Sequence, residues 1–131
     1  MGMYTELIFG ASLKEDTPIE VIETLKNMIG MDCDESKVIE IDFSRSPLVG
    51  SSYYFGVCES LTKLWYDEIS GEWILSTRSN IKNYYDDIEK FLEWIKPYIE
   101  SGSGSNDMYA IVTYECSGKP TVYYLNGDNN E

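Results

Sequence analysis

One apolar pattern in the second half of the chain constrains the fold more than any other feature. Ile88, Phe91, Leu92, Ile95 and Ile99 follow the spacing i, i+3, i+4, i+7 and i+11. Side chains at this spacing share one face of a helix with 3.6 residues per turn. The pattern predicts a helix over residues 84–99 whose apolar face must cover a core, with Pro97 kinking or ending it.

The residues before this helix have the alternation of a strand. Trp73, Leu75 and Thr77 fall on one face of residues 72–78, and polar side chains dominate the other face. Ser70-Gly71 separates this strand from residues 61–69, so the two segments predict a β-hairpin. Asn83 is expected to be the N-cap of the following helix, with Asp86 at the N3 position.

The remaining segments predict further strands and one more helix. The helix is expected to start with Thr17 as N-cap in a capping box with Glu20 and to end at Gly30. The segments with strand composition are residues 3–11, 37–43, 52–58, 108–116 and 121–125, and the last two form a hairpin. Residues 101–106 are expected to be a flexible connector and residues 127–131 a frayed tail.

This element order predicts the α+β class. Local hairpins favour a largely antiparallel sheet, and the two helices are expected to pack on one face of it. At 131 residues, with no repeat or change in composition, the chain is expected to form one domain over residues 1–131.

The chain is strongly acidic, with 23 Asp and Glu against 10 Lys and Arg and a net charge of −13. Residues 1–50, 51–100 and 101–131 carry net charges of −6, −4 and −3, so no single segment holds all of the excess negative charge. Such a field repels nucleic-acid backbones and anionic membranes, which makes direct nucleic-acid binding an unfavourable interpretation. A basic protein partner, or solubility alone, fits this charge better.

The sequence contains few residues that support catalysis or metal binding. Histidine is absent, and so are phosphate-binding glycine loops. Cys33, Cys58 and Cys116 are far apart and are expected to be reduced thiols. No apolar run reaches transmembrane length. We therefore expect a cytoplasmic, non-enzymatic protein without cofactor, metal or catalytic residues.

Arg78, Asn80 and Tyr85 are the candidate binding residues. Arg78 and Asn80 share one strand face just before a helix N-terminus, in a chain with few basic residues. The structural alternative is an Arg78 that forms a salt bridge with neighbouring acids. An aromatic group offers a similar choice between a stacking surface and a core, and the negative field favours the core; its members include Trp65, Tyr66, Trp73, Tyr84 and Tyr85.

Several segments together resemble a family of small uncharacterised proteins from bacteriophages, prophages and bacterial genomes. They are Tyr4-Thr5-Glu6-Leu7, residues 13–18 (LKEDTP), residues 50–56 (GSSYYFG), and residues 78–84 (RSNIKNY) leading into residues 88–95 (IEKFLEWI). The resemblance covers most of the chain and carries over no catalytic residue. It implies a small accessory protein in the cytoplasm of a bacterial host cell.

Three functions are compatible with these features. The first is a phage-type accessory protein that acts through protein–protein interaction with a host or phage protein. The second is an acidic inhibitor that mimics nucleic acid and occupies a host defence or nucleic-acid-binding protein. The third is a small-molecule binder or enzyme at the junction over residues 78–83. The sequence does not indicate the oligomeric state.

Overall fold

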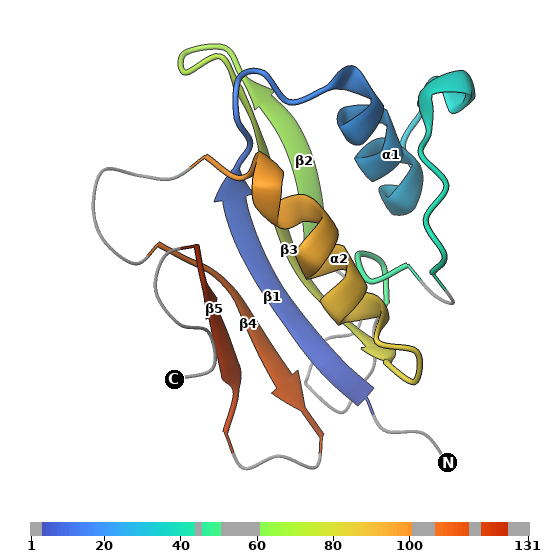
Figure 1. The fold of residues 1–131 in the computed structure, drawn as a ribbon, viewed down its shortest axis with the longest axis vertical. Helices are drawn as coiled ribbons and strands as arrows, with labels where there is room; N and C mark the ends of the chain where they lie inside the picture. The colour runs from blue at the N-terminus through green and yellow to red at the C-terminus, as the bar shows by residue number, and fades with distance from the viewer. Residues whose placement is uncertain (1–3, 44–45, 51–60, 101–106, 116–118, 126–131) are drawn as a thin grey trace.

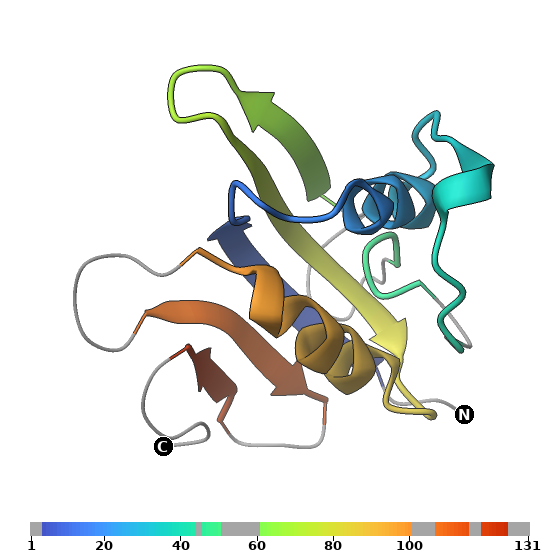
Figure 2. The same ribbon diagram turned by 45° about the horizontal axis from the view of Figure 1, so that its top comes forward.

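Five antiparallel strands form one sheet with the order β2-β3-β1-β4-β5, and both helices lie on the same face of it (Figures 1 and 2). The computed structural model describes residues 4–43, 46–50, 61–100, 107–115 and 119–125. The strands are β1 (Tyr4–Ser12), β2 (Leu61–Asp67), β3 (Glu72–Lys82), β4 (Met108–Tyr114) and β5 (Thr121–Tyr124). The helices are α1 (Ile19–Ile29) and α2 (Asp87–Ile95), and the predicted α+β class is confirmed.

Strand β1 lies at the centre of the sheet because both of its edges are paired. Leu7 lies opposite Ser79 of β3 and Val112 of β4, and its side chain is fully buried beneath the helices. The alternation predicted for β3 is confirmed on the same face, where Leu75 and Thr77 are buried. Arg78 and Asn80 belong to the opposite face, which we call the outer face.

Strand β3 extends to Lys82, so the residues predicted as a junction before the helix are part of the sheet. Strand β2 ends its pairing at Arg78, and beyond it the Asn80 N–H donates to the Gly50 carbonyl at 3.0 Å. A Cβ at Gly50 would collide with the carbonyl of Asn80, so only glycine lets the chain approach this edge.

Helix α2 has the predicted apolar stripe but starts later than predicted. Asp86, at φ 58°, precedes its first residue, and Asn83 is not the N-cap. The Asn83 side chain instead accepts a hydrogen bond from the Ile88 N–H at 3.0 Å, which satisfies a helix donor from a turn outside the helix. The predicted effect of Pro97 is confirmed, because α2 ends at Ile95 and a single 3₁₀ turn follows.

Helix α1 ends as predicted and starts differently. Gly30 adopts the left-handed conformation at φ 91°, and its N–H and that of Met31 close the helix. The predicted capping box is wrong, because the Thr17 hydroxyl donates to the Lys14 carbonyl at 2.6 Å and Pro18 is the residue that precedes the helix. Pro18 offers no side-chain cap, and the helix start is closed by the Val21 N–H, which donates to the Pro18 carbonyl at 3.0 Å.

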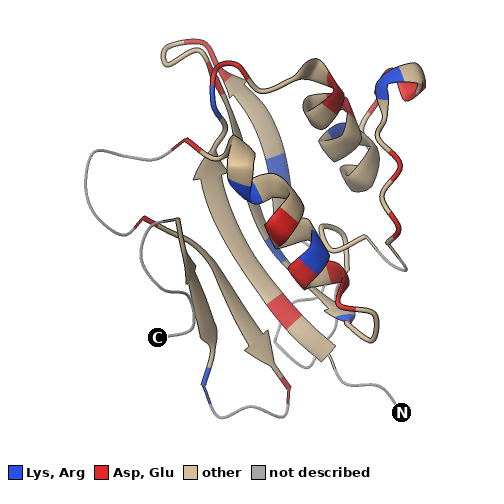
Figure 3. Cartoon of the chain, viewed as in Figure 1, with Lys and Arg blue, Asp and Glu red and all other residues tan. Residues whose placement is uncertain are grey.

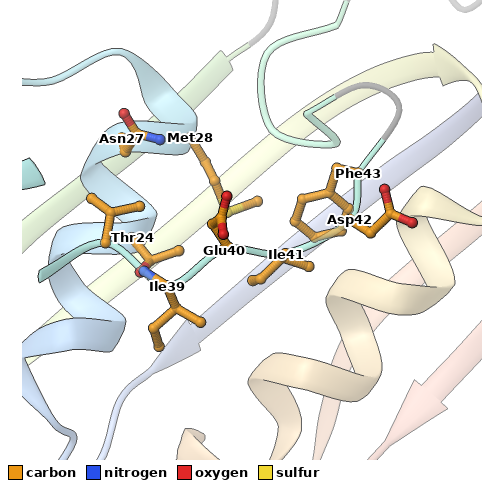
Figure 4. A pocket seen from close by; sticks show the side chains of 9 residues that line it. Thr24, Asn27, Met28, Ile39, Glu40, Ile41, Asp42 and Phe43 are labelled. Atoms are coloured by element: carbon orange, nitrogen blue, oxygen red, sulfur yellow. The ribbon is translucent and has the colours of Figure 1, made fainter.

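The prediction of a strand over residues 37–43 is wrong. A 3₁₀ turn at Glu35–Lys37 is followed by an extended segment, residues 38–43, that pairs with none of the described strands. Ile39, Ile41 and Phe43 alternate along it with Glu40 and Asp42 between the two helices, and Ile39 and Phe43 pack against the core (Figure 4). The predictions for residues 52–58, Cys58, Cys116, the connector and the tail lie outside the described residues.

The aromatic prediction is only partly right. Tyr66, Tyr84 and Tyr85 are 48%, 54% and 62% exposed, so these three rings are not core residues as predicted. The buried aromatic contact is made by Phe9 of β1 and Phe91 of α2, whose rings lie edge to face at 5.5 Å. The core is therefore centred under α2.

Candidate functional site

A groove of about 510 Å³ lies beside helix α1 (Figure 4). We call it the α1 groove. Its walls are one side of α1 and the extended segment 38–43, and its lining residues are Thr24, Asn27, Met28, Val38, Ile39, Glu40, Ile41, Asp42 and Phe43. Apolar and acidic side chains therefore alternate along one wall, while α1 supplies a small polar and apolar wall opposite.

Three hydrogen bonds fix the extended segment and the turn before it against the helices. The Thr24 hydroxyl accepts from the Ile39 N–H at 2.8 Å and itself donates to the Glu20 carbonyl within α1. The Glu23 carboxylate accepts from the Asp34 N–H at 2.7 Å. At the far end, the Lys90 ammonium of α2 donates to the Asp42 carbonyl at 3.1 Å. The segment is thus held at its two ends and spans the space between the two helices.

The middle of the segment has main-chain groups that the described residues leave unpaired. Glu40 has no hydrogen-bond partner for its N–H or its carbonyl among them, and the same holds for the Ile41 N–H. The Ile41 carbonyl accepts from the Phe43 N–H at 2.8 Å, which closes a tight turn at the end of the segment. Extended backbone with unpaired donors and acceptors is a template for a further strand.

The unit that builds the groove carries more than half of the net negative charge. Residues 15–43 contain nine acidic and two basic residues, a net charge of −7 out of −13. One of the two bases, Lys26, is already paired with Glu23 at 3.2 Å. Figure 3 shows the acids of this unit along α1 and the extended segment, whereas α2 carries acids and lysines together. The net charges of residues 1–50, 51–100 and 101–131 do not reveal this concentration, because residues 15–43 are only part of the first segment.

Two acids in the unit that builds the groove are stabilised as carboxylates. The pKa of Glu23 is lowered, mainly by the hydrogen bond from the Asp34 main chain and then by Lys26. The pKa of Asp34 is lowered by the hydroxyl and the main chain of Ser36. The Cys33 thiol lies beside them, and desolvation followed by the charges of Glu23 and Glu35 raises its pKa. A thiol held in the protonated form is a poor nucleophile. This cluster is therefore better suited to presenting negative charge than to covalent chemistry.

The three residues predicted from the sequence do not share a cavity. Arg78 forms an ion pair on the outer face, with its Nε 2.7 Å from the Glu6 carboxylate. Asn80 lies directly opposite Glu6 in the sheet and is 1% exposed, while Tyr85 is in the turn before α2. None of the three lines the α1 groove or either of two smaller pockets formed by described residues.

Asn80 is unusual because its side-chain amide is buried without a partner among the described residues. Neither its Oδ1 nor its Nδ2 makes a hydrogen bond with them, although both atoms are almost completely inaccessible. An unpaired buried amide reduces stability, in general by about 1–3 kcal/mol. The described residues therefore form a polar cluster of Glu6, Arg78 and Asn80 that lines none of the three pockets.

The groove could not be predicted from a sequence pattern that assigns residues 37–43 to the sheet. The alternation of Ile39, Ile41 and Phe43 with Glu40 and Asp42 is typical of a strand, and the chain is indeed extended there. The usable signal was the local acid excess, since a strand inside a sheet seldom places two acids beside an acidic loop.

The described residues contain neither a candidate metal site nor a helix that could span a membrane. They contain no group of three or more cysteine, aspartate or glutamate side chains arranged to hold a metal ion. None of the helices described is long and apolar enough to cross a membrane.

Comparison with known proteins gave no match: no protein-family model, no curated protein and no solved structure is similar to this chain. The resemblance to phage and bacterial proteins thus stays a prediction from the sequence.

Proposed function

We propose that this protein is a non-enzymatic interaction protein that binds an extended basic segment of a protein partner in the α1 groove. The observation that carries the proposal is the extended segment 38–43, whose central main-chain groups have no partner among the described residues. The resemblance to phage-type proteins supports an accessory role in a bacterial cytoplasm, with a host or phage protein as the partner.

The groove offers three kinds of contact to such a segment. The unpaired groups of Glu40 and Ile41 supply main-chain hydrogen bonds, which give affinity that does not depend on the partner's sequence. Met28, Ile41 and Phe43 supply half-buried apolar surface. The exposed Glu40 and Asp42 supply charge for lysine or arginine side chains of the partner. Together these contacts select an extended segment in which basic and apolar residues alternate.

The net charge of the chain supports the same choice of partner. A net charge of −13 raises the rate at which basic proteins encounter this surface, and the effect falls as salt screens the charge. The local charge of −7 in residues 15–43 places the strongest part of the field beside the groove.

The test uses a fluorescent peptide of alternating lysine or arginine and valine, with a glutamate–valine peptide of equal length as the negative control. Reversal of both rim charges, Glu40→Lys with Asp42→Lys, is expected to weaken binding about tenfold, since each exposed contact contributes up to about 1 kcal/mol. Glu68→Lys with Glu100→Lys changes the net charge equally, away from the groove. We expect this control to weaken binding about twofold, because it reduces only the long-range attraction between the protein and the basic peptide.

Two outcomes would overturn the proposal. Equal losses in the two double variants would show that only net charge matters and that the groove has no role. Turnover of a small molecule by the isolated protein would place it among enzymes instead. Capture of partners from host lysate with the wild type and the two double variants then identifies which natural proteins depend on the groove.

A second candidate is the nucleic-acid-mimicking inhibitor, which is favoured by the concentration of acid in residues 15–43. The lysines that accompany the acids on α2 speak against a continuous acidic face (Figure 3). The two candidates differ in competition: a duplex DNA would displace the protein from its partner only if the protein occupies a nucleic-acid-binding surface.

A further inference from the structure

A second pocket, of about 250 Å³, lies on the opposite flank of helix α2 from the extended segment. We call it the α2–β5 pocket. Helix α2 and the turn after it supply Glu89, Leu92, Glu93 and Lys96, while Tyr109 comes from β4 and Tyr123 from β5. Neither the predicted binding residues nor the α1 groove includes any of these side chains.

One carboxylate in this pocket is fixed in place before any ligand arrives. The Glu89 Oε1 accepts from the Asn83 amide at 2.7 Å, and its Oε2 accepts from the hydroxyl of Tyr114. Each carboxylate oxygen can accept a second hydrogen bond. Glu89 therefore presents a preorganised negative charge with acceptor capacity remaining.

Two tyrosines form the aromatic side of the pocket. The rings of Tyr109 and Tyr123 lie at 61° to one another with their centroids 6.2 Å apart. Tyr109 is 4% exposed, and neither hydroxyl forms a hydrogen bond with the described residues. Desolvation raises the pKa of Tyr109 to about 12, and that of Tyr123 is raised by desolvation and by Glu89. Both phenols are thus neutral at physiological pH and available as acceptors.

We propose that the α2–β5 pocket binds an organic cation that donates hydrogen bonds, namely an alkylammonium or a guanidinium group. Two carboxylates, two phenol oxygens and electron-rich rings all favour a positive group, and Leu92 provides apolar contact for its alkyl chain. Lys96 is the one opposing charge, and it leaves the lining acidic by one unit. The cation is either a free small molecule or the side chain of a lysine or arginine in a protein.

The pocket is independent of the proposed groove because α2 separates the two. A failure in one site therefore leaves the other intact, and variants of each can be tested separately.

The experiment titrates the isotope-labelled full chain with n-butylguanidine, n-butylamine, a capped tripeptide with a central arginine, tetramethylammonium and butyrate, and follows Leu92 methyl and tyrosine ring signals by NMR. We expect saturable binding of the two butyl cations. Binding of the tripeptide as well would assign the pocket to a protein side chain, and its exclusion would assign it to a free small molecule. Either result supports a cation site.

Variants locate the binding. Glu89→Gln is expected to weaken the guanidine at least about tenfold, because it removes a charge-assisted hydrogen bond. The exposed Glu93→Gln is expected to weaken it about twofold to fivefold and does not disturb the hydrogen bonds of Glu89. Glu72→Gln removes the same charge on the β2–β3 hairpin and is expected to leave the affinity unchanged.

Four results would overturn the proposal. The first is tighter binding of butyrate than of the cations, which would make Lys96 the anchor. The second is binding of tetramethylammonium as tight as that of butylguanidine, which would exclude hydrogen bonding. The third is equal effects of Glu93→Gln and Glu72→Gln, and the fourth is the absence of saturable shifts in the folded wild type.

Discussion

The two helices are attached to the same sheet by different kinds of contact. Helix α2 is packed by apolar side chains, and Ile88, Phe91 and Ile95 are fully buried against the sheet. Helix α1 buries Val21, Ile22 and Leu25, but hydrogen bonds of its polar side chains connect it to the chain that follows. Close packing leaves no space for a ligand between α2 and the sheet, whereas the polar tethers hold the segment after α1 only at points and leave a groove between them.

The strongest test of this contrast is Phe91→Ala. The side chain is fully buried and packs edge to face on Phe9, so its removal leaves a cavity. We expect the free energy of unfolding to fall by about 3–5 kcal/mol in chemical denaturation. Ile69→Ala is the control, since Ile69 is 97% exposed and its truncation should change stability little. A loss below 1 kcal/mol for Phe91→Ala would mean that α2 is not packed as described.

Tyr114→Phe tests a hydrogen bond to a charged side chain of α2, the Glu89 carboxylate. The Tyr114 hydroxyl donates to Glu89, and a hydrogen bond to a charged group contributes about 2 kcal/mol. Desolvation, followed by Glu89, raises the pKa of Tyr114. Because the folded pKa lies above the unfolded value of 10.0, this stability is complete below pH 10 and is lost as pH rises through the folded pKa. The variant should therefore lose less stability in alkali than the wild type, and Tyr85→Phe, at an exposed ring, should behave like the wild type.

Thr24→Val tests a tether of α1. The substitution keeps the shape of the side chain and removes the acceptor of the Ile39 N–H, so we expect a loss of about 1 kcal/mol. Hydrogen exchange at the Ile39 amide should accelerate, while amides in α2 and β1 stay protected. Thr17→Val, at a partly exposed threonine outside the tether, is the matched control. Global acceleration of exchange would contradict the separation of the two regions.

Asn80→Leu provides a comparison on the outer face. A leucine of similar size removes an amide that has no partner in the described part of the chain, so we expect an increase in stability of up to about 1 kcal/mol. Asn80→Asp should strongly destabilise the protein, since it would bury a second carboxylate beside Glu6. A marked loss of stability in Asn80→Leu would show that the amide takes part in a needed contact.

The smallest expected effect is the acid dependence contributed by Glu23. Its pKa is lowered in the folded state, so this contribution is present above the unfolded value of 4.5 and is lost as pH falls through the folded pKa. Glu23→Gln keeps an acceptor for the Asp34 N–H, and its unfolding free energy should fall less steeply on acidification than that of the wild type. Glu20→Gln in the first turn of α1 is the control. Identical acid profiles for all three proteins would remove Glu23 from the tether.

The sequence by itself determined the elements whose side chains follow a single period and pack against a single surface. The stripe from Ile88 to Ile95, the alternation of β3, the turn at Gly71 and the end of α1 at Gly30 all follow from local rules and are confirmed. The helix starts were less determined, because the Asn83 side chain reaches Ile88 from outside the helix and the Thr17 hydroxyl turns back to Lys14. Several side-chain partners of similar energy compete at a helix start.

Only the tertiary structure decided what the extended segment 38–43 contacts. Its alternating pattern fits a strand equally well. In the structure, however, β1 has β3 and β4 as neighbours, and the Ile39 N–H donates to the Thr24 hydroxyl instead of to a strand. Tertiary contacts also paired Arg78 with Glu6 and brought Glu89, Tyr109 and Tyr123 to one pocket from three separate elements. Local propensity acts over a few residues, whereas a binding surface depends on which distant segments compete for the same hydrogen bonds and the same face of the sheet.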